Sequence, residues 1–141
     1  GRRRKTDAPL LYSVAGKHIN TLHLGASVKA MAMDEQHVVF GMRLGKMELW
    51  DLKKRALTCS MRATERFKSI KTIAMSASYV LAAPGRSRDL VGKVATDTGL
   101  TKAWLLTRDG ELLHTLDHGE NVAQSGVCVS DAYAVTSAED G

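Results

Sequence analysis

The sequence is poor in the residues that mark disordered, disulfide-rich or membrane-spanning proteins. Its 141 residues include two prolines, two cysteines and 12 glycines, and aromatic residues make up 5%. So little proline argues against a low-complexity, disordered chain. No apolar run reaches the roughly 18–20 residues that cross a bilayer, and no apolar stretch behind the basic start has the pattern of a secretory signal. A globular domain remains, and 44% apolar residues are enough for a core.

The two cysteines, Cys59 and Cys128, have no CxxC spacing and form no disulfide framework. Both lie in segments of alternating apolar residues, so we expect buried free thiols. Free thiols fit a reducing compartment, which is the cytoplasm or the nucleus.

Catalytic and metal-binding motifs are also missing. The sequence has no GxSxG elbow, no P-loop and no HExxH helix. His114 and His118 are four residues apart, but they fall on a strand and a loop rather than on one face of a helix. We therefore expect no enzyme activity, no metal and no cofactor.

One hairpin pattern occurs three times. Residues 33–41, 75–83 and 129–137 each contain an apolar strand end, a short polar or small turn, and a second apolar strand that opens with His or Tyr. Their starts are 42 and 54 residues apart. Residues 11–28 also match residues 105–122 at a constant offset of 94. If two units separate this second pair, the mean repeat is about 47 residues, near the ~40–45 of propeller blades.

The apolar residues recur mostly at a spacing of two, which favours strands over helices. A four-stranded sheet of this size cannot cover both of its faces alone, but sheets stacked on one another can. With the strands of a unit called a to d, we predict a basic tail at 1–8 and a partial propeller at 9–141. The units are strands c and d at 9–23, whole blades at 28–61 and 71–117, the second with an insertion at 84–101, and strands a and b at 122–141.

The segment from Gly41 to Lys54, GMRLGKMELWDLKK, leads from a glycine turn into an alternating strand that ends in Trp-Asp. With the repeats, it resembles the WD40-repeat β-propellers over nearly the whole chain after Ala8. The resemblance implies an all-β, WD40-like propeller segment with about three blades' worth of four-stranded antiparallel sheets. It also implies a structural set of His, Ser or Thr, Asp and Trp in each blade. The residues that fall at or near such positions are Trp50, Asp51, Trp104, His118, Ser137 and Asp140.

The set is degenerate in the middle of the chain. Arg43 stands about where the turn Asp of the second unit would be, and Trp104 is followed by Leu105 rather than Asp. Propeller rings hold 4–8 blades, and three would leave edge strands open. The chain also begins with Gly1 and ends where another strand c is expected. Three explanations stay open: a piece of a longer chain, a split propeller completed by another polypeptide, and a six-bladed homodimer.

Antiparallel strands place the b–c and d–a loops on one face and the a–b and c–d turns on the other. On the first face, eight basic side chains stand against three acidic ones, and the formal net charge of the whole chain is +5. The eight are Arg43, Arg62, Arg66, Lys68, Lys71, Arg86, Arg88 and Lys93. They form either a solvated loop surface or a docking patch for an acidic protein segment, phosphate or RNA.

These features predict a non-catalytic scaffold for protein–protein interaction within a larger macromolecular complex. Its partners would be other proteins of the complex, or the remaining blades on the same or another chain. The alternative is a propeller that contacts RNA in a ribonucleoprotein or ribosome-biogenesis complex. The basic run at 2–5 fits a nucleic-acid or localisation element or a solvated tail, but Phe67 is the one aromatic residue placed among the basic ones for stacking on bases.

Overall fold

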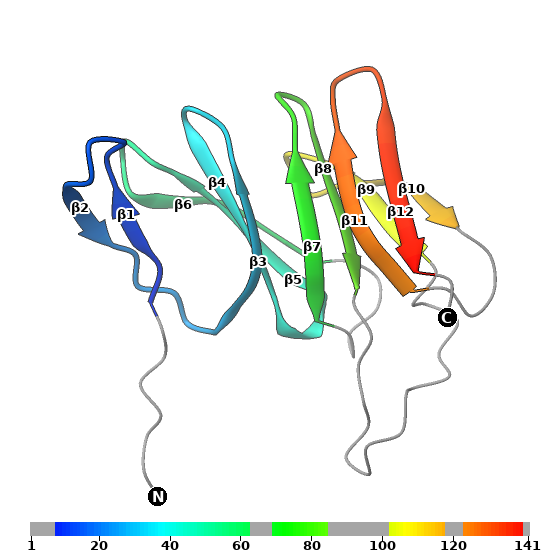
Figure 1. The fold of residues 1–141 in the computed structure, drawn as a ribbon, viewed down its shortest axis with the longest axis horizontal. Coiled ribbons are helices and arrows are strands. Elements are labelled where there is room, and N and C mark those ends of the chain that lie inside the picture. Colours follow the sequence, from blue (N-terminus) through cyan, green and yellow to red (C-terminus); the bar gives the residue numbers. More distant parts are fainter. Residues whose placement is uncertain (1–7, 63–68, 85–101, 118–122, 140–141) are drawn as a thin grey trace, which may run out of the picture.

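The computed structural model describes residues 8–62, 69–84, 102–117 and 123–139. Its strands form four antiparallel sheets that follow one another in chain order, with two, four, four and two strands. Figure 1 shows the first sheet at one end of the molecule and the last sheet at the other. Among the described residues, no helix has the length and apolar character needed to cross a bilayer.

The first sheet is a hairpin and the second a four-stranded meander. The hairpin pairs β1 (Leu10–Tyr12) with β2 (His18–Thr21). The meander has the order β3-β4-β5-β6. Its strands are β3 (Val28–Met33), β4 (His37–Met42), β5 (Lys46–Asp51) and β6 (Ala56–Arg62), with a short 3-10 turn η1 (Arg43–Gly45) between β4 and β5.

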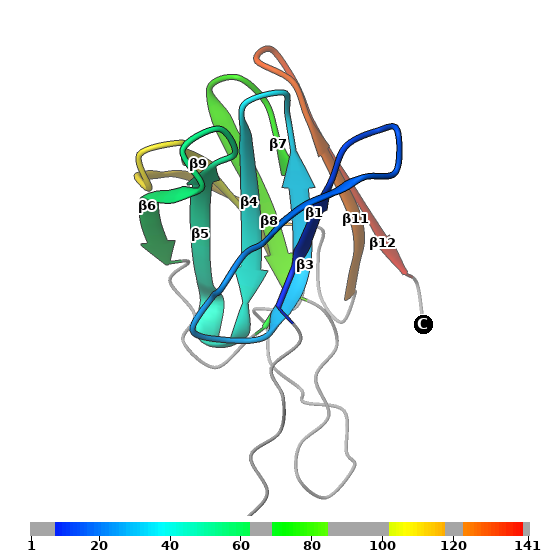
Figure 2. The same ribbon diagram turned by 90° about the vertical axis from the view of Figure 1, so that its left-hand side faces the viewer.

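The third sheet repeats the meander and the fourth is again a hairpin. The third has the order β7-β8-β9-β10, with strands β7 (Ile70–Met75), β8 (Tyr79–Pro84), β9 (Lys102–Thr107) and β10 (Leu112–Asp117). The fourth pairs β11 (Ala123–Val129) with β12 (Ala134–Glu139). Figures 1 and 2 show the a–b turns of the last three sheets pointing the same way.

The three repeated hairpins have the same turn chemistry. The first turn residue is Asp34, Ser76 or Ser130, and each donates its N–H to the carbonyl of the residue three places later at 2.8–2.9 Å. Each side-chain oxygen also accepts from the backbone N–H of that later residue, at 2.7 Å, 3.1 Å and 3.0 Å respectively. Short polar side chains of this kind stabilise turns by bonding to nearby backbone groups. The predicted threefold hairpin is thus confirmed.

The match at offset 94 is also visible in the backbone. The turn between β1 and β2 and the turn between β9 and β10 are closed by equivalent bonds, from Gly16 N–H to Ser13 O at 2.9 Å and from Gly110 N–H to Thr107 O at 3.0 Å. Both glycines have positive φ, 88° and 96°. A residue with a Cβ rarely adopts this conformation, which explains why glycine stands at both positions.

The cores lie between the sheets. Along β4, Val39 faces the third sheet, while Val38 and Phe40 are on the other side and pack with Leu22, which directly follows β2. Along β8, Val80 faces the second sheet and Leu81 faces the fourth. Alternate side chains therefore pack on opposite sides, and each full burial of such a side chain stabilises the fold by about 1.5–3 kcal/mol.

The first strand of each meander lies next to the first strand of the following sheet, so β7 contacts both β3 and β11. Sheets stacked face to face around their first strands form the predicted architecture, a WD40-like propeller segment. One prediction about this stack is wrong. Cys59 is half-buried, but Cys128 is exposed because it lies on the side of β11 that no described sheet covers.

Candidate interaction surfaces

Three of the eight predicted patch residues lie in the described part of the chain. Arg43 is on η1, Arg62 ends β6 and Lys71 is on β7, and all three are exposed. The structure brings their elements together, because η1 contacts β7 and the Arg62 guanidinium Nη1 donates to Leu44 O at 3.1 Å. The other five lie outside the described residues: Arg66, Lys68, Arg86, Arg88 and Lys93.

Leu44 follows Arg43 in η1, accepts the hydrogen bond from Arg62, and is unusual in two ways. Its φ is 60° and its ψ is 29°, which is the left-handed region that residues with a Cβ avoid. Its apolar side chain is also 52% exposed. A leucine in a strained turn with its side chain in solvent is the kind of outlier that suggests a contact surface.

The tryptophan of the second sheet has a partner that the sequence pattern does not suggest. The Trp50 indole N–H donates to Glu48 Oε1 at 3.0 Å. Glu48 is buried, with 7% of its surface exposed, and its other oxygen lies 3.2 Å from Lys46 Nζ. A buried carboxylate is costly unless it is paired and hydrogen-bonded, and here it is both.

Asp51 has a turn-forming role. Its Oδ1 accepts from Lys54 N–H at 2.8 Å, and its Oδ2 lies 3.8 Å from His37 Nε2. The hydrogen bond from Lys54 is the main cause that lowers the pKa of Asp51 below its ordinary value.

The remaining residues of the predicted structural set are spread over the third and fourth sheets. Trp104 on β9 is fully buried in the core between the second and third sheets. Ser137 on β12 shares a hydrogen bond with the Ser125 hydroxyl at 2.9 Å. His118 and Asp140 lie outside the described residues.

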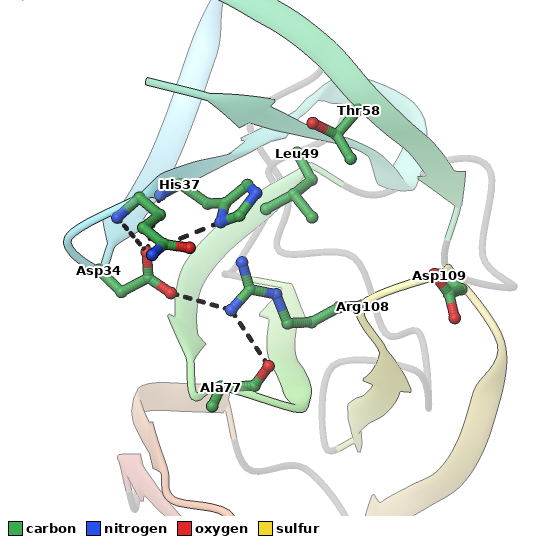
Figure 3. A pocket seen from close by; sticks show the side chains of 8 residues that line it. Asp34, His37, Leu49, Thr58, Ala77, Arg108 and Asp109 are labelled. Carbon is green, nitrogen blue, oxygen red and sulfur yellow. Dashed lines mark hydrogen bonds and ion pairs between the residues drawn. The ribbon is translucent and has the colours of Figure 1, made fainter. Parts of the chain in front are cut away.

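On the opposite face, Arg108 in the β9–β10 turn connects two sheets. Its Nη1 donates to Asp34 Oδ2 of the second sheet at 2.9 Å and to the Ala77 carbonyl of its own sheet at 3.2 Å (Figure 3). It also donates to the Ser76 carbonyl at 3.1 Å. The side chain is 16% exposed. Charge-assisted bonds in such a setting are stronger than those between neutral groups.

Asp131 extends this connection to the fourth sheet. Its two oxygens accept from the backbone N–H and the hydroxyl of Ser78, at 3.0 and 3.3 Å. Hydrogen bonds from Ser76 and Ser78 lower the pKa of Asp131. Partial burial alone would raise the pKa of Asp34, but bonds from the Gln36 and His37 N–H groups and from Arg108 hold it below its ordinary value.

A pocket of about 440 Å³ lies beside Arg108, between the second and third sheets. It is lined by Asp34, Gln36, His37, Leu49, Thr58, Ala77, Arg108 and Asp109 (Figure 3). The described residues contain no group of three or more His, Cys, Asp or Glu side chains that could hold a metal ion. The Asp34 and Arg108 charges are already paired, so this face mainly links sheets.

Sequence reasoning missed Arg108. At the offset of 94, Arg108 corresponds to Val14, so the repeat does not place an arginine at both equivalent positions and does not point to a role for Arg108. The sequence offered one signal for a contact. Arg108 directly follows β9, and the β9–β10 turn lies beside the β7–β8 turn of the same sheet.

Comparison with known proteins gives a likeness of fold. No family model matches the sequence, and no curated protein sequence matches it. Two solved structures, one of the RRP9 WD40 repeats and one of U3-55K, each match 76% of this chain at a TM-score of 0.56 and 12% identity. The fold is WD40-like. The chain spans 30% and 31% of the lengths of those two chains.

Proposed function

We propose that this chain is a non-catalytic scaffold whose basic loop face docks an acidic segment of a partner protein within a larger complex. The observation that supports it most is the grouping of Arg43 and Arg62 around the exposed Leu44. The bond from Arg62 to Leu44 O fixes one guanidinium nitrogen on the turn. Arg43 is exposed on η1, and η1 contacts β7, the strand that carries the exposed Lys71.

A partner that fits this surface carries carboxylates around an apolar side chain. The carboxylates meet the guanidinium groups, and the apolar side chain covers Leu44. Surface charges of this kind steer association and select the partner more than they add affinity. The stacked sheets contribute rigidity, because Arg62 at the end of β6 bonds to η1, and η1 itself contacts β7 of the next sheet.

RNA is the second candidate, and the same positive surface supports it. Binding that neutralises several phosphates weakens steeply as salt rises, whereas an acidic peptide with an apolar anchor depends less on salt. The free thiols Cys59 and Cys128 fit either role in the cytoplasm or the nucleus.

The test compares two triple variants with the same change in charge. The face variant is Arg43→Ala/Arg62→Ala/Lys71→Ala, and the control is Lys17→Ala/Lys53→Ala/Lys54→Ala, whose lysines lie in the β1–β2 and β5–β6 turns on the opposite face. The probes are a glutamate-rich peptide with one leucine and a single-stranded 12-nucleotide RNA, each fluorescently labelled.

For the peptide, we expect the face variant to bind about tenfold more weakly than the wild type, since three surface charges of ~0.5 kcal/mol each are lost. The control should stay within about twofold. Equal losses in the two variants would contradict a face-specific site. RNA binding with a steep salt slope, together with no peptide binding, would replace the first candidate with the second.

A further inference from the structure

The pocket between the second and third sheets has a lining whose charge is opposite in sign to that of the whole chain. Its ionised side chains are the carboxylates of Asp34 and Asp109 and the guanidinium of Arg108, so the lining has a formal charge of −1 with His37 neutral. The formal net charge of the whole chain is +5. A local excess of negative charge raises the concentration of cations beside it, so the pocket favours a basic ligand.

The two carboxylates of the pocket differ in what they already bind. Asp34 Oδ1 accepts from the N–H groups of Gln36 and His37 at 2.8 and 2.7 Å, and Asp34 Oδ2 accepts from Arg108 Nη1 at 2.9 Å. Asp109 is exposed, and the ion pairs among the described residues do not include it. Of the two carboxylates, that of Asp109 is therefore the one placed to take a cation from a ligand.

The Arg108 guanidinium has hydrogen-bond donors that the sheets do not use. Its three hydrogen bonds to described residues all start at Nη1. A guanidinium has several N–H donors in one planar fork, and Figure 3 shows the other terminal nitrogen on the side that faces His37 and Leu49. An oxygen atom of a ligand can accept from this side. A neutral carbonyl suits it better than a carboxylate, because two carboxylates already line the pocket.

The pocket has an apolar floor and an open, polar mouth. Leu49 on β5 lines it and is 2% exposed. Gln36, Thr58 and Asp109 line it as well, and all three are exposed. The volume of about 440 Å³ lies in the range of about 300–1,000 Å³ that is typical of ligand sites. A pocket with so exposed a lining suits part of a polypeptide segment better than an enclosed small molecule.

Close backbone contacts hold the walls of the pocket in place. A Cβ built at Gly110 would lie 3.0 Å from Met61 Cβ and 3.7 Å from Cys59 Sγ. The β9–β10 turn therefore packs directly on β6, the strand that carries Thr58. On the other side of the pocket, Arg108 bonds to the β3–β4 turn. Walls that are fixed before binding lose little freedom when a ligand arrives, which favours affinity.

We propose that this pocket docks an extended segment of a partner protein with a lysine or arginine side chain at its centre. The cationic group pairs with Asp109, and the aliphatic stem lies on Leu49, as such stems commonly cover apolar surface. A main-chain carbonyl of the segment accepts from the free side of the Arg108 guanidinium. The Thr58 hydroxyl and the Gln36 amide bond to its other main-chain groups. This site lies on the face opposite the basic loop face and takes a ligand of the opposite charge.

The first experiment presents four sets of acetylated and amidated pentapeptides to the immobilised protein. Each set has varied flanking residues and one fixed central residue, which is lysine, arginine, norleucine or glutamate. Norleucine keeps the aliphatic stem of lysine without its charge. We expect the lysine and arginine sets to be retained at least about threefold more than the norleucine set, and the glutamate set to be retained least. Equal retention of all four sets, or a preference for glutamate, would overturn the proposal.

The lysine peptide that binds most tightly is then titrated against pocket variants by fluorescence anisotropy. Asp109→Asn removes the charge with almost no change in shape, and we expect it to weaken binding about threefold to fivefold, as for an exposed ion pair. Glu111→Gln is the matched control, because Glu111 is exposed in the same turn and does not line the pocket. It should change binding by less than about 1.5-fold. Equal effects of the two variants would contradict a site at Asp109.

A second pair of variants tests the pocket without removing Asp109. Thr58→Arg places a cationic side chain in the mouth of the pocket, where it competes with the ligand for Asp109, so binding should fall at least about tenfold. Ser60→Arg adds the same charge on β6 outside the lining and should weaken binding less than about twofold. Both positions are exposed, so both variants should keep the β-sheet circular dichroism. Peptide binding that survives Thr58→Arg would place the peptide elsewhere and overturn the proposal.

The basic-face variant Arg43→Ala/Arg62→Ala/Lys71→Ala separates this site from the proposed function. It should leave binding of the lysine peptide within about twofold, and Asp109→Asn should do the same for the glutamate-rich peptide. If each variant weakened both peptides equally, the two faces would not be separate sites and the pocket proposal would fail. Loss of one peptide alone counts against its own site only.

Discussion

Arg108 joins the turns of two neighbouring sheets. Its single nitrogen Nη1 binds a carboxylate of the second sheet and two carbonyls of the third. Arg108→Ala leaves Asp34 without its cationic partner, so we expect a loss of about 1–3 kcal/mol in the free energy of unfolding. Urea unfolding measures this loss.

Lys53→Ala is the control for that experiment, because Lys53 is an exposed cation in a turn of the same face. It should change stability by less than about 0.5 kcal/mol. Arg108→Lys should fall between the two, since a lysine keeps the charge but lacks the planar fork. If Arg108→Ala cost no more than Lys53→Ala, the link between the sheets would be energetically unimportant.

At the scale of the element, the approach of β4 to β7 depends on a glycine. A Cβ built at Gly41 would lie 2.5 Å from Ile70 Cγ2 and 2.7 Å from Ile70 Cβ. Ile70 is fully buried, so it cannot move aside. We expect Gly41→Ala to destabilise the protein by about 1–3 kcal/mol through overpacking, measured by thermal or urea unfolding.

Gly25→Ala provides the comparison, because a Cβ at Gly25 meets no atom within 4 Å. This variant should be neutral or slightly stabilising, since it reduces the freedom of the unfolded chain. Similar losses in both variants would mean that β4 and β7 are not in close contact.

The elements were the most predictable part of the molecule. Asp34, Ser76 and Ser130 each cap a turn at the same place in the repeat, so the three hairpins follow from local chemistry. The contacts of single side chains were less predictable. Trp50 donates a hydrogen bond to Glu48, two residues before it on the same strand. The His, Ser or Thr, Asp and Trp pattern of a WD40 blade does not include this Glu, so the pattern does not predict the pair.

For the candidate sites, the sequence indicated the basic loop face through the alternation of strand directions, and three of its residues lie in the described part of the chain. Arg108 was not predictable, because its bonds join turns that are 31, 32 and 74 residues away. The period of the repeat and the spacing of its residues do not predict which turn of one sheet contacts which turn of the next.

At the scale of the whole molecule, stability comes from stacking. Most of the buried apolar side chains belong to clusters that two neighbouring sheets share. Two of the three clusters in the described residues join neighbouring sheets, which is the burial argument that the repeat suggested. The exposure of Met31 and Val135 follows from the same rule, because no described sheet has its own first strand packed over either side chain.

The measurement that tests this stacking most directly is the oxidation rate of individual methionines, followed by mass spectrometry after brief exposure to peroxide. Met42 on β4 and Met47 on β5 are both fully buried, and they lie in the clusters on opposite sides of the second sheet. We predict that both are oxidised at least about tenfold more slowly in buffer than in denaturant, because the third sheet covers Met47 and the segment after β2 covers Met42. Oxidation of either methionine at its denatured-state rate, in a chain that keeps its β-sheet circular dichroism, would contradict the stacked propeller arrangement.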